Sequence, residues 1–166
     1  MSDATFQAAL QTIIETVTDI GNVYTDDDNC LYSNLVSDLN SASDARYTTS
    51  NAEDVIRFVI IGVSEINGFR RQATGKRAAA HRTYVYSIKF YAGLDRTGNA
   101  QDNGRRDFID RVNLATEALE SNNTIGGSDF QNAAPALTQF SFAMFGGVLC
   151  HYAEIIQTVE GKGYTI

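Results

Sequence analysis

The spacing of apolar residues divides the chain into helix-like and strand-like segments. Near the N-terminus, apolar side chains recur in steps of three and four residues, which places them on one stripe of an α-helix. This stripe predicts an amphipathic helix over roughly residues 4–20, ended by Gly21 and Asn22. The same spacing returns later and predicts a second amphipathic helix over roughly residues 105–120.

Between these two helices the apolar period changes to that of a strand. Residues 55–63 are rich in β-branched residues and, apart from Arg57, are apolar on both alternations, which is typical of a central strand buried on both faces. Residues 81–91 alternate between apolar and polar side chains, so they predict a strand with one buried face. Residues 68–80 are too many for a tight turn, and we expect a hairpin with a long tip.

A second hairpin is predicted near the C-terminus. Residues 137–145 and 148–159 are rich in strand-forming residues and are separated by Gly146 and Gly147. A Gly-Gly pair between two such segments indicates a two-residue turn, because both positions tolerate a positive φ. A further short strand is expected at Val23 and Tyr24.

The order helix, hairpin, helix, hairpin predicts an α+β fold. We expect an antiparallel sheet of about four or five strands with two amphipathic helices packed on one face. No internal repeat or Pro- or Gly-rich linker divides the 166 residues. The sequence therefore predicts a single domain over residues 1–166, with an acidic polar excursion at about residues 22–54.

Opposite charges are unevenly distributed along the chain. The first 54 residues contain ten Asp or Glu and one Arg, whereas the remainder contains ten acidic and twelve basic residues. The formal net charge of the whole chain is -7. Such a chain is a poor candidate for a dedicated nucleic-acid binder, because phosphate neutralisation supplies most non-specific affinity.

One short stretch is nevertheless strongly basic. Five of the thirteen Lys and Arg residues fall at the tip of the first predicted hairpin: Arg70, Arg71, Lys76, Arg77 and Arg82. A solvated loop is one explanation. The other is an electrostatic contact with phosphate or with the acidic first third of a neighbouring copy. On the second reading, residues 69–82 and 22–54 contribute to interfaces between subunits or with partners.

The densest acidic group is Asp26, Asp27 and Asp28. An EF-hand loop that began at Asp26 would need Glu at its twelfth position, which is Ser37 in this chain. The motif fails, so the sequence favours a solvated acidic loop that is available for contacts and predicts no metal site.

Candidate catalytic residues are few. The two imidazoles, His81 and His151, fall inside predicted strands without a Cys, Asp or Glu neighbour at ligand spacing. Cys150 precedes His151, but adjacent residues of a strand point to opposite faces, so a packed core cysteine is favoured. With Cys30 far away in sequence, the two cysteines indicate no disulfide framework.

Nucleotide-binding and hydrolase motifs are also missing from the sequence. Gly75-Lys76 is followed by Arg77, whereas a phosphate-binding loop requires Ser or Thr there. We therefore expect no catalytic residues and no cofactor. The apolar runs are shorter than the about 18 residues of a membrane span, so we also expect no membrane partner.

The order of several segments carries a family resemblance. After the N-terminal helix come Arg57-Phe-Val-Ile-Ile-Gly-Val, the basic loop, and His81-Arg-Thr-Tyr-Val-Tyr-Ser-Ile-Lys-Phe-Tyr91. The helix at residues 106–119, Asn123-Thr-Ile-Gly-Gly127 and Phe145-Gly-Gly-Val-Leu-Cys-His-Tyr-Ala-Glu-Ile-Ile156 follow. In this order the chain resembles the phage tail terminator family, small proteins that close the end of a tail tube and join it to the head.

This resemblance implies a structural virion protein without enzymatic activity. It would form a ring, expected to be a hexamer, that sits on the last ring of the tail tube and docks the neck. Its partners would be copies of itself, the tail tube protein and a neck or connector protein, with DNA passing non-specifically through the lumen. It would be assembled in the host cytoplasm and reside in the virion.

Two alternatives stay open at this stage. The first is a neck or head-completion protein between portal and tail, which could share small size and ring symmetry. The second belongs to a different class, a small enzyme that acts through His151, Glu154 or Asp107.

Overall fold

The computed structural model describes residues 3–25, 57–72, 79–93, 101–122, 130–145 and 148–164. The elements in chain order are α1 (Asp3–Glu15), β1 (Asn22–Thr25), β2 (Arg57–Gln72), β3 (Ala79–Gly93), α4 (Gln101–Ser121), β4 (Phe130–Asn132), β5 (Ala136–Phe145) and β6 (Val148–Tyr164). The acidic excursion from residue 26 onward, including Asp26, Asp27 and Asp28, lies outside the described residues, and so do Lys76 and Arg77.

The described strands form one mixed sheet, and the predicted α+β class is confirmed. The strand order is β1-β2-β3-β6-β4, and β5 also pairs with β6. Two details differ from the prediction. The sheet has six strands, and β1 runs parallel to β2, whereas the other pairs are antiparallel. Parallel neighbours need a long crossover, and residues 26–56 provide the length for one.

The central strands extend further than their sequence patterns indicate. β2 continues to Gln72 and β3 begins at Ala79, so most of the segment expected as a polar tip at residues 68–80 is strand. Register shifts interrupt the β2–β3 ladder between Val63 and Glu65 and between Asn67 and Arg70. Asn67-Gly68 resembles a turn signal in the sequence, but here it falls at an irregularity within a continuing strand.

The first helix is shorter than predicted. α1 ends at Glu15, after which the amides of Thr16 and Val17 donate to carbonyl oxygens three residues earlier. Asp19 and Gly21 then adopt positive φ angles of 59° and 85° and turn the chain into β1. A side chain at Gly21 would collide with the backbone of Arg57, so glycine is required by both conformation and space.

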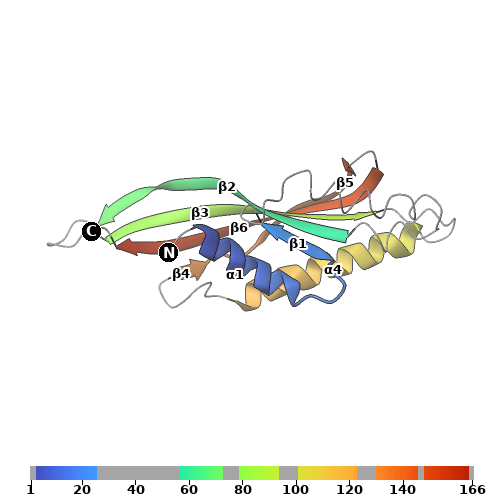
Figure 1. Ribbon diagram of the computed structural model, residues 1–166, viewed down its shortest axis with the longest axis horizontal. Coiled ribbons are helices and arrows are strands. Elements are labelled where there is room, and N and C mark those ends of the chain that lie inside the picture. Colours follow the sequence, from blue (N-terminus) through green and yellow to red (C-terminus); the bar gives the residue numbers. More distant parts are fainter. Residues whose placement is uncertain are drawn as a thin grey trace.

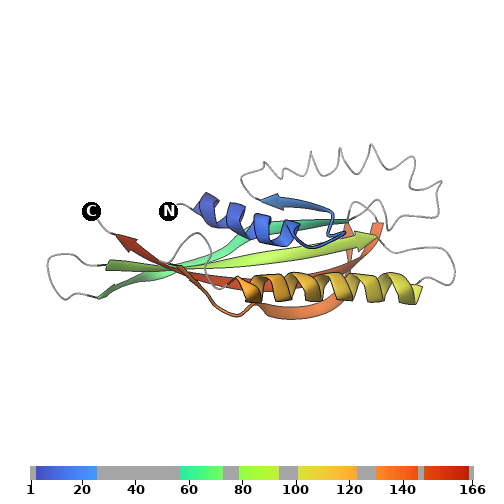
Figure 2. The same cartoon turned by 90° about the horizontal axis from the view of Figure 1, so that it is seen from below.

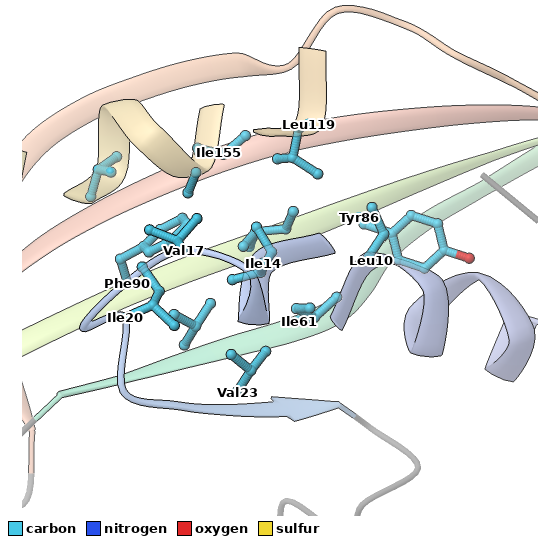
Figure 3. Packing of buried hydrophobic residues seen from close by; sticks show 14 of the residues in the cluster. Leu10, Ile14, Val17, Ile20, Val23, Ile61, Tyr86, Phe90, Leu119 and Ile155 are labelled. Carbon is cyan, nitrogen blue, oxygen red and sulfur yellow. The ribbon is translucent and has the colours of Figure 1, made fainter. Parts of the chain in front are cut away.

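Both helices lie on the same side of the sheet, as Figures 1 and 2 show. A single cluster of buried apolar side chains joins α1 and α4 to alternate positions of β2, β3 and β6 (Figure 3). The alternation predicted for β3 is confirmed, since its buried positions include Tyr84, Tyr86, Ile88 and Phe90. Val17 and Ile20 also belong to this core although they follow the last residue of α1.

The sheet is longer than its helical layer. β2, β3 and β6 continue together past the start of α1 toward the end at which the C-terminus lies (Figure 1). We call this part of the three strands the distal end and define it by the opposed positions Arg70, His81 and Lys162.

Candidate functional site

Basic residues from three strands meet at the distal end. Arg70 of β2 is directly opposite His81 of β3, and His81 is opposite Lys162 of β6. Arg71 and Arg82 occupy neighbouring positions of β2 and β3 in the same ladders. Of the five predicted basic interface residues, Arg70, Arg71 and Arg82 thus occupy nearby backbone positions of two paired strands rather than of a loop.

Lys162 is the residue that sequence reasoning missed. It is distant in sequence from the other basic residues and reaches them only through the antiparallel pairing of β6 with β3. The continued alternation of β6 beyond residue 159 is weak, because glycines 161 and 163 flank this lysine. The ladder thus adds a cation to the basic group that the sequence already shows.

The residues of the alternative enzyme reading are not brought together. His151 and Glu154 are three positions apart in a regular stretch of β6, so they lie on opposite faces of the sheet. His151 stacks on Phe108 of α4 with ring centroids 5.5 Å apart, whereas Glu154 lines a depression on the face away from the helices. Asp107 is exposed on α4. No single constellation of these three side chains forms.

His151 is a buried imidazole at the border of the core. It is only 3% exposed and lies between Phe108 and Phe142, with its Nε2 lacking a hydrogen-bond partner among the described residues. Burial lowers its pKa from the ordinary value near 6.5, and the positive charges of Arg105 and Arg111 lower it further. The ring is therefore neutral at physiological pH and acts as a flat packing group between two aromatic rings.

The opposite face of the sheet holds a small polar group. The Ser87 hydroxyl donates to Oε1 of Glu154, and the Tyr152 hydroxyl donates to Oε2 of the same carboxylate at 3.3 Å. Burial raises the pKa of Tyr152 to about 12, with further contributions from the charge of Glu154, from Tyr91 and from the hydrogen bond. Together with Lys89, Ser87 and Glu154 line an open depression of about 290 Å³. Its geometry suits a hydrogen-bonded sheet surface better than an enclosed substrate pocket.

Cys150 belongs to an aromatic cluster on that same face. The thiol is fully buried and packs with Phe58, and Tyr91 and Phe145 lie against this pair. The rings of Phe58 and Tyr91 stack with centroids 4.8 Å apart. The predictions that Cys150 is a core cysteine and that it points away from His151 are confirmed.

The β5 strand presents a different kind of surface. Its ten residues contain no charged side chain, and among the described residues it pairs only with β6, so it forms an edge of the sheet. Met144 is 64% exposed and Phe142 is 48% exposed, and Leu149 of β6 is exposed directly opposite Met144. We call Phe142, Met144 and Leu149 the β5 patch.

A basic side chain of α4 lies against the β5 patch. The Arg105 guanidinium lies over the Phe142 ring at 5.3 Å from its centroid, and Arg106 is exposed beside it on α4. Figure 2 shows the β5–β6 hairpin alongside α4. The sequence contains the signal for this surface, an uncharged strand, but only the topology reveals that the strand lies at an edge.

Neither a metal-binding group nor a membrane-spanning helix is found in the described part of the chain. No group of three or more His, Cys, Asp or Glu side chains there is arranged to hold a metal ion. Neither described helix combines the length and the apolar character that crossing a membrane requires.

Comparison with known proteins adds no family assignment. No protein-family model matches this chain, and no curated protein matches it at a significant level.

Proposed function

We propose that this protein is a structural virion component that assembles into a ring, caps the end of a phage tail tube and joins the tube to the head or neck. The ring is expected to be a hexamer. It acts by shape and surface contact, and its partners are further copies of the chain, the tail tube protein and a neck or connector protein.

The order of the elements supports this proposal. The resemblance to tail terminators rests on a helix, a hairpin with a basic tip, a second helix and a C-terminal hairpin, and the described elements follow that order. A closed ring requires that one surface of each subunit complements a different surface of the next.

The basic distal end is the observation that carries the contact part of the proposal. Register places Arg70 and Lys162 on either side of His81, with Arg71 and Arg82 adjacent in the ladders. The first 54 residues of the same chain carry ten acidic side chains and one basic side chain. Opposite charges held on different parts of one subunit favour ordered association between copies.

Electron microscopy of tails tests the proposal. Tail tubes assembled with the protein should have a defined length and a distinct ring at one end, whereas tubes assembled without it should continue to grow. A variant with Arg70, Arg71, Lys76 and Arg77 changed to Glu should form rings poorly and respond less to salt. Tubes that end in the same way with or without the protein would refute the proposal, as would its absence from purified particles.

A further inference from the structure

We propose that β5 is a docking site for a strand of another protein, an extended segment that is apolar at alternate positions and carries a carboxylate. This segment adds to the outer edge of β5, places its apolar side chains on the β5 patch and directs its carboxylate to Arg105. The inference goes beyond the proposed function and does not depend on the virion role.

The first observation is the open backbone edge of β5. Among the described strands β5 pairs with β6 alone, so the backbone groups that face away from β6 have no strand partner there. Figure 2 shows β5, in orange, at the lower margin of the molecule. Natural proteins usually protect such an edge with charges, proline or bulges. Apart from one irregularity between Leu137 and Gln139, β5 has none of these, so its edge is a template for an added strand.

The second observation is that the two faces of β5 differ. Phe142 is directly opposite His151, whose ring stacks on α4, so Phe142 and Met144 lie on the helix side of the sheet. Their side chains are 48% and 64% exposed. On the other face, Ser141 and Ala143 are small and offer little apolar area. A partner strand therefore gains most by placing apolar side chains on the helix side, at every second position.

The third observation is the charge beside the β5 patch. The Arg105 guanidinium lies over the Phe142 ring, and no carboxylate pairs with it among the described residues. Contact with the ring holds this cation next to the exposed edge. A partner carboxylate would meet it there, and such a pair at the margin of an interface fixes the register of docking more than it adds affinity.

A second copy of β5 is a less suitable occupant of this edge. If β5 paired with itself about a two-fold axis near Phe142, the two Arg105 guanidinium groups would approach each other, because each lies over its own Phe142 ring. Like charges that face each other across an interface oppose association. A strand of another protein that carries a carboxylate replaces this repulsion with attraction.

Selection from a library of random peptides of about eight residues, the length of a typical strand, tests the chemistry of the occupant. The full-length protein is immobilised, and the peptides that it retains are sequenced. We expect alternation of apolar and polar residues and enrichment of Asp or Glu. Peptides without alternation, enrichment of Lys or Arg, or no enrichment at all would overturn the inference.

Substitutions in the full-length protein test the location of the site. Met144→Glu places a charge in the β5 patch, and Leu114→Glu is the matched control because Leu114 is 49% exposed on α4. Met144→Glu should weaken binding of a synthetic selected peptide about tenfold or more, and Leu114→Glu should leave it unchanged. Arg105→Gln should weaken it about two- to fivefold, and Arg106→Gln less.

Isothermal titration calorimetry measures these affinities, and circular dichroism with a melting temperature verifies that each variant is folded. Equal affinity of the peptide for wild type and Met144→Glu would place it elsewhere on the protein and overturn the inference. That result would leave the proposed function standing.

Methylation of single peptide amides tests strand addition itself. An N-methyl group removes a hydrogen-bond donor, and in a strand only alternate amides face a given neighbouring strand. Methylation at every second position should therefore abolish binding, whereas methylation at the intervening positions should have little effect. A uniform response along the peptide would contradict strand addition. Dimerisation of the protein without peptide, if Met144→Glu removed it, would assign the edge to a second copy and likewise overturn the inference.

Discussion

β3 and β5 flank the same strand, β6, and carry similar apolar residues on the same side of the sheet, yet their environments differ. On β3, Tyr86 and Ile88 are fully buried under the two helices. On β5, Phe142 and Met144 project from the same side but are about half exposed or more. α4 contacts β5 at its margin, where Phe108 meets Phe140 and Arg105 lies over Phe142, and it leaves much of the Phe142 and Met144 side chains exposed.

This difference separates side chains that stabilise the folded subunit from side chains that stay exposed on its surface. The apolar side chains of β3 have partners within the subunit and stabilise its core. Those of β5 gain less from folding of the isolated chain, because Phe142 and Met144 stay about half exposed or more. Four measurements test this division.

The largest expected effect comes from truncating a core residue of β3. Ile88→Ala should lower the free energy of unfolding by about 2–5 kcal/mol, because it leaves a cavity beneath the helices. Met144→Ala on β5 should lower it by less than about 1 kcal/mol in the monomer. Urea unfolding at a concentration where the protein is monomeric measures both values. Equal losses would show that β5 belongs to the folding core.

The next effect concerns the turn that seats α1 over the sheet. Gly21→Ala should cost about 1–3 kcal/mol of unfolding free energy, because the residue has a φ of 85° and its Cβ would strike the backbone of Arg57. Thr18→Ala, at an exposed position of the same turn, is the control. Thermal unfolding should show a lower melting temperature for Gly21→Ala alone. A wild-type melting temperature would mean that coverage of β3 does not depend on this turn.

A smaller effect depends on pH and concerns His151 of β6, which lies between β3 and β5 in the sheet. The folded protein lowers the pKa of His151 below 6.5, so as pH falls the unfolded chain binds the proton first. Stability contributed by the neutral ring is present above pH about 6.5 and is lost as pH falls, by at most about 1.4 kcal/mol per pH unit. His151→Leu should remove this loss. The stability difference between variant and wild type should therefore grow in favour of the variant from pH 7 to pH 5, and a constant difference would contradict the assignment.

The smallest effect concerns the cation above the exposed aromatic ring. Arg105→Gln removes the contact with Phe142 and should lower the free energy of unfolding by up to about 1 kcal/mol. It should also raise the pKa of His151 toward its ordinary value, because the charge of Arg105 lowers that pKa in the folded protein. An NMR titration of the imidazole detects the shift. Arg106→Gln is the neighbouring control and should move the titration less.

The local periods in the sequence determine much of the fold. Alternation identifies the buried face of β3, and three-to-four spacing identifies both helices, because these periods follow directly from strand and helix geometry. The same reasoning separates Cys150 from His151, since neighbouring strand residues face opposite sides. The charge imbalance and the basic cluster are likewise properties of the sequence alone.

Long-range pairing decides the rest. Nothing local to residues 22–25 distinguishes parallel from antiparallel pairing, and the irregular ladder extends β2 through an apparent turn at Asn67-Gly68. Only register places Lys162 opposite His81 and near Arg70, and only strand order leaves β5 without a second strand neighbour among the described residues. These features depend on which strands become neighbours, a choice set by the packing energy of the whole sheet and helical layer rather than by any short segment.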